Sequence, residues 1–178
     1  FNQVGGGTDI NILVNHPTFP NPPDEVRQLQ TFDTGADFRE NYGGRVRALF
    51  IPPISGAWNL FVTADDGSRL FFNPTGPNAA GKVLIREETP GCWTAFAGRQ
   101  TGPFNLVAGQ GYYLEGIYKE AGGGDYIRVA ARLASDPTLA AQRRLAQCLR
   151  LTWGARLHRG FFLRAEDFFG FQKGLARG

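Results

Sequence analysis

The sequence predicts an all-β fold of antiparallel strands, either a β-sandwich or a barrel. Composition is the first indication, because 15 Phe, 5 Tyr and 3 Trp accompany 24 Gly and 11 Pro in 178 residues, a balance typical of strands joined by many turns. Spacing is the second indication: short apolar stretches recur at regular intervals, separated by glycine- or proline-containing turns, with no helical pattern between them. A hydrophobic fraction of 42% is enough for one packed core.

The individual strands are expected from the alternation of apolar and polar residues. The apolar run Ile10–Val14 is interpreted as a first strand. The proline-rich segment 17–24 cannot be helical, because each proline restricts its own φ and the residue before it. The strand at 45–51 stops at a Pro-Pro pair, and the strand at 58–63 places alternate side chains on opposite faces. The other expected strands are 69–72, 83–85, 104–107, 112–119 and 126–133.

Charge divides the chain into an expected β domain, residues 1–136, and a basic tail, residues 137–178. The first part holds 11 Lys/Arg against 14 Asp/Glu, and the second holds 8 Lys/Arg against 2 Asp/Glu. Residues 139–151 contain good helix formers and no breaker, so the tail is interpreted either as a basic helix or as a subunit-contact segment for self-association. No nucleic-acid-binding motif accompanies its arginines, and no apolar run approaches the roughly 18 residues of a membrane span. We therefore expect neither a nucleic-acid partner nor a membrane span.

Asp65 and Asp66 stand side by side between two hydrophobic strands and are followed by Gly67. An Asp-Gly turn needs only one aspartate, and two adjacent carboxylates repel each other unless a cation relieves the repulsion. Carboxylate oxygens are preferred ligands of calcium. The residues alone leave two interpretations open: a Ca²⁺ site at a loop tip, or a solvated Asp-Gly hairpin with one spare charge.

The remaining reactive residue types argue against catalysis. The two histidines lie in unrelated contexts, and neither a nucleophile elbow nor a phosphate-binding loop is present. Glu87 and Glu88 are chain neighbours, whereas glycosidase carboxyls face each other across the scissile bond, so we interpret both as solvent-facing charges. Cys92 and Cys148 could pair or stay free. The sequence therefore predicts a protein that is not an enzyme.

Five motifs follow one another along the chain. They are residues 42–48 (YGGRVRA), 51–58 (IPPISGAW), 61–70 (FVTADDGSRL), 104–115 (FNLVAGQGYYLE) and 119–125 (KEAGGGD). In this order they resemble the protective-antigen-type (PA14) domain family, and the resemblance covers about residues 19–135. It is strongest to the bacterial extracellular branch, whose members often carry Phe-Pro-Asn-x-Pro early and Lys-Glu-Gly-Gly-Gly-Asp late.

The resemblance implies an antiparallel β-sandwich and an extracellular or cell-surface location, since the family occurs in secreted toxins, adhesins, yeast flocculins and glycosidases. In its sugar-binding members two adjacent aspartates, joined by a cis peptide, chelate one Ca²⁺, and sugar hydroxyls fill open positions on the ion. Carried over to this chain, the resemblance makes Asp65 and Asp66 both metal ligands and glycan-binding residues.

A second loop of the implied site falls at Glu120–Asp125, between the last two strands of the family pattern. Glu120 and Asp125 would supply carboxylate oxygens to the ion. Gly123 and Gly124 would allow the backbone to approach the ion and its ligand closely.

Two further residues are candidates for contact with a sugar. Trp93 is the aromatic residue best suited to stack on a sugar ring, and Asn73, beyond the aspartate pair, could donate hydrogen bonds. The predicted function is an extracellular, calcium-dependent carbohydrate-binding or adhesion module with a glycan or polysaccharide partner. The alternative is a structural subunit of an extracellular assembly or filament, which would use the sandwich and the tail for protein contacts.

Overall fold

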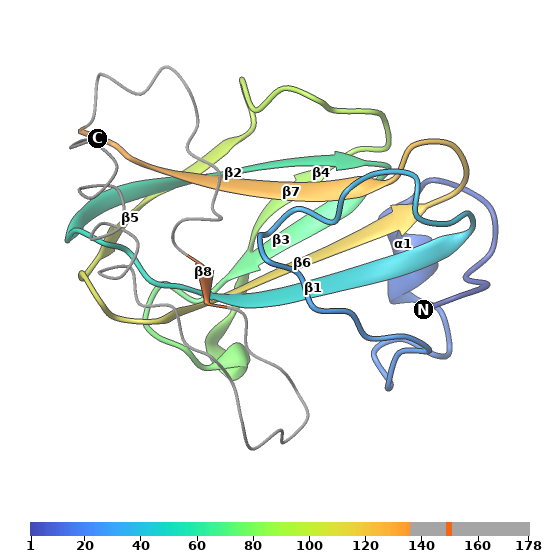
Figure 1. The fold of residues 1–178 in the computed structure, drawn as a ribbon, viewed down its shortest axis with the longest axis horizontal. Helices are drawn as coiled ribbons and strands as arrows, with labels where there is room; N and C mark the ends of the chain where they lie inside the picture. The colour runs from blue at the N-terminus through green and yellow to red at the C-terminus, as the bar shows by residue number, and fades with distance from the viewer. Residues whose placement is uncertain (136–148, 151–178) are drawn as a thin grey trace, which may run out of the picture.

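A computed structural model of the chain describes residues 1–135 and 149–150, and it shows an antiparallel β-sandwich (Figure 1). One sheet has five strands in the order β4-β3-β6-β1-β8, and the other has three in the order β5-β2-β7. The predicted fold class is therefore confirmed. The strands are β1 (Tyr42–Phe50), β2 (Gly56–Asp65), β3 (Ser68–Phe72), β4 (Val83–Glu88), β5 (Gln100–Leu106), β6 (Tyr112–Glu120), β7 (Tyr126–Leu133) and β8 (Leu149–Arg150), and a short 3-10 helix spans Ala79–Gly81.

The core lies between the two sheets and follows the predicted alternation. On β2, the inward side chains include Trp58, Leu60 and Val62, which pack in the central cluster with Phe50 and Phe72. The opposite face of β2 is also buried, because the segment between β4 and β5 covers it and brings the ring of Phe96 to 6.4 Å from that of Phe61. Both faces of the three-stranded sheet are thus protected near its central strand.

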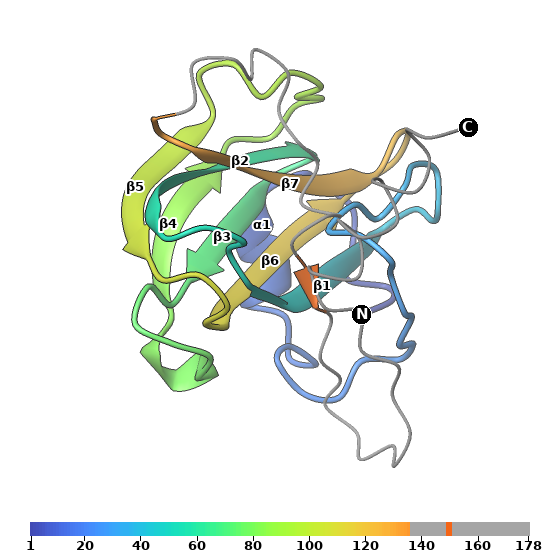
Figure 2. The ribbon, with the colours of Figure 1, turned by 60° about the vertical axis from the view of Figure 1, so that its left-hand side comes forward.

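Residues Ile10–Val14 form a helix, α1, and not the predicted strand. The Asp9 side chain caps it by accepting a hydrogen bond from the backbone N–H of Asn11 at 2.7 Å. Ile10 and Leu13, three residues apart on one helix face, are buried beside Ile117 of β6. The apolar run is explained by this packing onto the outer face of the five-stranded sheet, where α1 lies beside β6 in both views (Figure 1, Figure 2).

The segment around Asp65 and Asp66 is not a hairpin. β2 belongs to the three-stranded sheet and β3 to the five-stranded sheet, so this segment crosses from one sheet to the other. The connection from β6 to β7 crosses between the same two sheets, and both crossings lie at the right-hand end of the sandwich in Figure 1. This topology brings the two loops of the predicted site to the same end of the molecule.

The tail prediction is tested only at two residues. Leu149 and Arg150 form β8, which pairs antiparallel with Phe50 and Leu49 of β1, so the predicted helix is wrong there. The rest of the predicted helix, Cys148, and the proposed self-association segment lie outside the described residues. Among the residues that are described, no helix is long and apolar enough to cross a membrane.

Candidate metal and ligand site

Three carboxylates from two strand ends converge where the chain crosses between the sheets. Asp65 ends β2, Asp66 follows it, and Glu120 ends β6. One carboxylate oxygen from each residue lies within 4.8 Å of the others. Asp65 and Asp66 are joined by a cis peptide bond, which is the arrangement that the resemblance implies. We refer to Asp65, Asp66 and Glu120 as the acidic cluster.

Backbone hydrogen bonds hold the crossing segment against the end of β6. Asp66 N–H donates to the carbonyl of Lys119 at 3.1 Å, and Lys119 N–H donates to the carbonyl of Gly67 at 3.0 Å. The Asp66 carboxylate in turn accepts from the N–H of Ala121 at 3.2 Å. A side chain at Gly67 would begin only 2.8 Å from the carbonyl oxygen of Thr8, so glycine is required for this close approach.

Glu120 is the most informative member of the acidic cluster. Its side chain is 0% exposed, and neither carboxylate oxygen has a hydrogen-bond partner among the described residues. A buried ionised carboxylate without donors or a counter-ion is strongly unfavourable. Burial, followed by the charges of Asp66, Asp125 and Asp65, raises the pKa of Glu120 to about 7. Burial also raises the pKa of Asp66, against the hydrogen bond from Ala121.

One buried cation lies next to the acidic cluster. Lys119 is 0% exposed, and its ammonium group donates to the backbone carbonyl of Glu120. Burial lowers the pKa of Lys119, while Glu120 and Asp66 act in the opposite direction. When all three carboxylates are ionised, they and the one ammonium group leave two negative charges, which is the charge that a divalent cation neutralises.

The oxygen ligands that the acidic cluster offers fit calcium. The three groups offer only carboxylate oxygens, the hard ligands that Ca²⁺ takes in a shell of roughly 6–8 oxygens. The unpartnered oxygens of Glu120 are the observation that favours a bound cation, because the described protein atoms leave them without a donor. The residues present therefore could hold the metal that the resemblance implies.

Asp125, predicted as a fourth metal ligand, is not brought into the acidic cluster. Its carboxylate accepts hydrogen bonds from the N–H groups of Phe38 and Arg39, at 2.8–2.9 Å, and from the hydroxyl of Tyr42 at 2.8 Å. The lone pairs of this buried carboxylate are thus directed to donors from another part of the chain. Asp125 fixes the loop that precedes β1.

The two predicted loop glycines lie beside the acidic cluster. A Cβ atom on Gly124 would be 3.2 Å from a carboxylate oxygen of Asp65, so the loop approaches this closely only without a side chain. Gly123 has φ +105°, in the region that favours glycine, and its N–H donates to the carboxylate of Glu40. Glu40 lies far away in the sequence, and no local motif singles it out.

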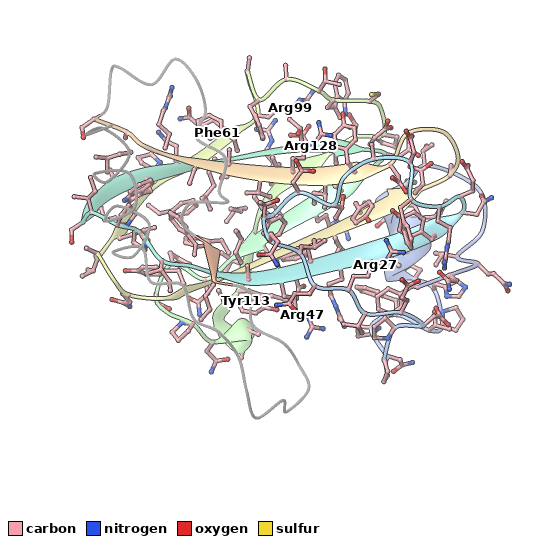
Figure 3. The ribbon with its side chains drawn as sticks, viewed as in Figure 1. Arg27, Arg47, Phe61, Arg99, Tyr113 and Arg128 are labelled. Carbon is pink, nitrogen blue, oxygen red and sulfur yellow. The ribbon has the colours of Figure 1, made fainter. Side chains whose placement is uncertain are left out.

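The ring of Trp93 is partly buried and already stacked. The guanidinium carbon of Arg99 lies 3.9 Å from the ring centroid, and the indole N–H donates to the carbonyl of Thr89 at 2.7 Å. The backbone N–H of Trp93 donates to the carbonyl of Ala64 at 3.1 Å. Trp93 therefore lies next to the acidic cluster, because Ala64 precedes Asp65 on β2. Figure 3 shows Arg99, together with Phe61 and Arg128, on the side of the three-stranded sheet.

Asn73 is not near the acidic cluster. It follows the far end of β3 and is 3% exposed. Its side-chain oxygen accepts from the N–H and hydroxyl of Thr75, and its amide group donates to the carbonyl of Asn78 at 2.7 Å. These bonds close a local turn, so the predicted sugar contact is replaced by a structural role.

The adjacent glutamates differ from the predicted solvent-facing pair. Glu87 pairs with Arg69 and is 43% exposed, but Glu88 is buried and bound by both Arg86 and Arg99. The prediction is therefore correct for Glu87 and wrong for Glu88. Arg99, which lies beyond β4 in the sequence, helps to cover Glu88. Cys92 is an exposed free thiol whose sulfur lies 3.7 Å from the hydroxyl of Tyr126.

Comparisons with known proteins support the fold alone. No known family model matches the sequence, and no curated protein matches it. An anti-sigma factor domain-containing protein from Clostridium clariflavum is similar in structure, with a TM-score of 0.53, 20% identity, and coverage of 74% of this chain and 42% of that one. Another anti-sigma factor domain-containing protein gives a TM-score of 0.50 at 17% identity, over 68% of this chain and 37% of that one.

A third solved structure is more distant. It is the A domain of Epithelial Adhesin 6 from Candida glabrata in complex with Galb1-3GlcNAc, with a TM-score of 0.40, 16% identity, and coverage of 56% of this chain and 46% of that chain. This score is too low to support a shared site. The chain spans less than half the length of each of these solved chains.

Proposed function

We propose that this chain is a non-enzymatic, extracellular carbohydrate-binding module of the PA14 type that depends on calcium. The observation that carries the proposal is the buried carboxylate of Glu120, which has no hydrogen-bond donor in the part of the chain that the structure describes and lies within 4.8 Å of carboxylate oxygens of Asp65 and Asp66. The motif order supports the same assignment, because it places an aspartate pair and a second loop, Glu120–Asp125, at the positions where the sugar-binding members of that family have their two ligand loops.

The residues have separate tasks in this proposal. Asp65, Asp66 and Glu120 hold the cation through carboxylate oxygens, and Lys119 balances the charge that the cation leaves. Gly123 and Gly124 keep the facing loop free of side chains, so that a ligand can approach the acidic cluster. When bound, calcium supplies open coordination positions that suit the paired hydroxyls of a sugar. Single sites of this kind bind weakly, and tandem copies would gain strength through avidity.

Calcium binding and glycan retention test the proposal in sequence. Calorimetric titration of the metal-free chain should show one calcium site, and Asp65→Asn should weaken it by at least about tenfold, since one charged ligand is lost. Wild-type protein should be retained on a polysaccharide column in calcium and released by EDTA. Glu87→Gln, which removes an exposed carboxylate on β4, is the matched control and should behave as wild type.

Two results would contradict the proposal. Calcium binding that survives Asp65→Asn unchanged would place the ion elsewhere. Retention on polysaccharide that EDTA does not affect would show that sugar recognition, where it occurs, uses another surface.

A further inference from the structure

Two exposed carboxylates border the acidic cluster. Asp37 and Glu40 belong to the loop before β1, and the bonds from Phe38 and Arg39 to the carboxylate of Asp125 hold the backbone between them. Asp125 is 1% exposed and therefore fixes this loop from the inside. The loop is thus positioned by Asp125, the residue that immediately precedes β7.

Contacts with the glycine loop show how close these carboxylates come to the acidic cluster. A Cβ on Gly124 would lie 3.2 Å from an oxygen of Asp65 and 3.9 Å from an oxygen of Asp37, so both side chains border the same small space. Both oxygens of Glu40 accept from Gly123 N–H, at 3.2 and 3.3 Å. Glu40 is therefore held at the rim of this space and does not extend freely into solvent.

Nearby basic groups have other partners. Within residues 1–135, no ion pair joins a lysine or arginine to Asp37 or Glu40. Arg39 bonds the side chains of Asn2 and Glu25, and Arg128 pairs with Asp33. Lys119 is buried beneath the cluster. A calcium ion would neutralise the cluster but would leave the two rim charges uncompensated.

We infer that the site selects glycans that carry a free amino group, such as glucosamine units, and rejects glycans that carry carboxylates, such as uronic acids. Sugar hydroxyls would face the cluster while a neighbouring ammonium group pairs with Asp37 and Glu40. This inference rests on the proposed function and names its ligand class. Exposed ion pairs each change affinity by factors of roughly 1.5 to 5, so two of them together give a preference of roughly twofold to 25-fold.

Three β1,4-linked oligosaccharides of equal length provide the test: glucosamine, glucose and glucuronic acid oligomers. Binding is measured at low salt, in saturating free calcium and at mildly acidic pH, where the sugar amine is protonated. The wild-type chain should bind the amino sugar roughly twofold to 25-fold more tightly than the neutral sugar, and it should bind the acidic sugar more weakly than the neutral one. The preference should shrink as salt screens the rim charges.

The variants separate this inference from the function on which it rests. Asp37→Asn with Glu40→Gln should remove the amine preference while leaving calcium affinity within about threefold; the Gln side chain keeps an acceptor for Gly123. Glu87→Gln should change neither the amine preference nor the calcium affinity. Equal binding of amino and neutral oligomers, or a preference that the double variant retains, would overturn the inference alone. Failure of all three oligomers to bind in saturating calcium would overturn both the inference and the carbohydrate-binding function.

Discussion

Replacing Glu120 with glutamine should make the metal-free protein more stable at neutral and basic pH. Glu120 is fully buried and lacks a hydrogen-bond donor among the described residues. Its pKa is raised from 4.5 in the unfolded chain to about 7 in the fold. That difference of about 2.5 units corresponds to roughly 3 kcal/mol of destabilisation when the group is ionised.

The sign of the pH dependence follows from the raised pKa. Below pH 4.5 the carboxyl of Glu120 is protonated in both the folded and the unfolded chain, so it does not lower the free energy of unfolding. As pH rises from about 4.5 to about 7, the unfolded chain releases its proton while the folded chain retains it, so the free energy of unfolding falls; above about pH 7 the decrease is complete. Glu120→Gln removes this pH-dependent destabilisation, because the glutamine side chain stays neutral at every pH.

Urea unfolding in EDTA, at several pH values between 5 and 8, measures this effect. The stability difference between Glu120→Gln and wild type should favour the variant increasingly as pH rises, by up to about 3 kcal/mol or roughly 6–12 °C in Tm. Taking the difference cancels the other titrating groups that both proteins share. A difference that stays constant across this range would refute the assigned environment of Glu120.

Calcium should reverse the order of the two proteins. A ligand at about 1,000 times its Kd stabilises the state that binds it by roughly 4.1 kcal/mol, which exceeds the advantage of roughly 3 kcal/mol expected for the variant, and only wild type retains all three carboxylates of the cluster. Saturating calcium should therefore raise the Tm of wild type clearly and that of Glu120→Gln much less. An equal rise in both would show that Glu120 is not a ligand.

Two further substitutions distinguish structural residues from ligand-binding ones. Asp125→Ala removes the acceptor of two backbone N–H groups in the loop before β1 and of the Tyr42 hydroxyl on β1. It should destabilise the fold by roughly 3 kcal/mol in chemical denaturation, and Asp125→Asn should lose about half as much. A wild-type stability for the alanine variant would contradict the assignment. Asn73→Ala opens the turn beyond β3 and should lower the free energy of unfolding by about 1–2 kcal/mol in calorimetry. Calcium and glycan binding should stay unchanged. A loss of glycan retention in a folded Asn73→Ala protein would show that this residue belongs to the binding site.

The sequence identified most of the acidic cluster but not its geometry. The adjacent aspartates stood out because like charges side by side need a reason, and Glu120 was reached through the motif order. The role of Asp125 was beyond sequence reasoning, because its donors lie 83–87 residues away along the chain. Glu40 and Asp37 carried no local signal at all, since only folding brings their loop to the glycine segment.

Local patterns failed where an element was short or its partner distant. Ile10–Val14 is an apolar run that fits a strand as well as a helix. The Asp9 cap and packing onto the outer face of β6 stabilise the helix. The segment after β2 was a plausible hairpin, because an Asp-Gly turn is a frequent hairpin signal. Nothing within ten residues reveals that the next strand joins the other sheet.

The sequence by itself determined the fold class and the extent of most strands, because alternation along a strand is set by the two-residue repeat of the extended chain. Only the tertiary structure decided which sheet each strand joins, and thereby which carboxylates meet. Both crossings, after β2 and after β6, pass between the sheets at one end, and the hydrogen bonds between them seal Glu120 away from water next to Asp66. Burial and charge proximity, which shift its pKa and favour a cation, arise from that long-range pairing and are invisible in any local pattern.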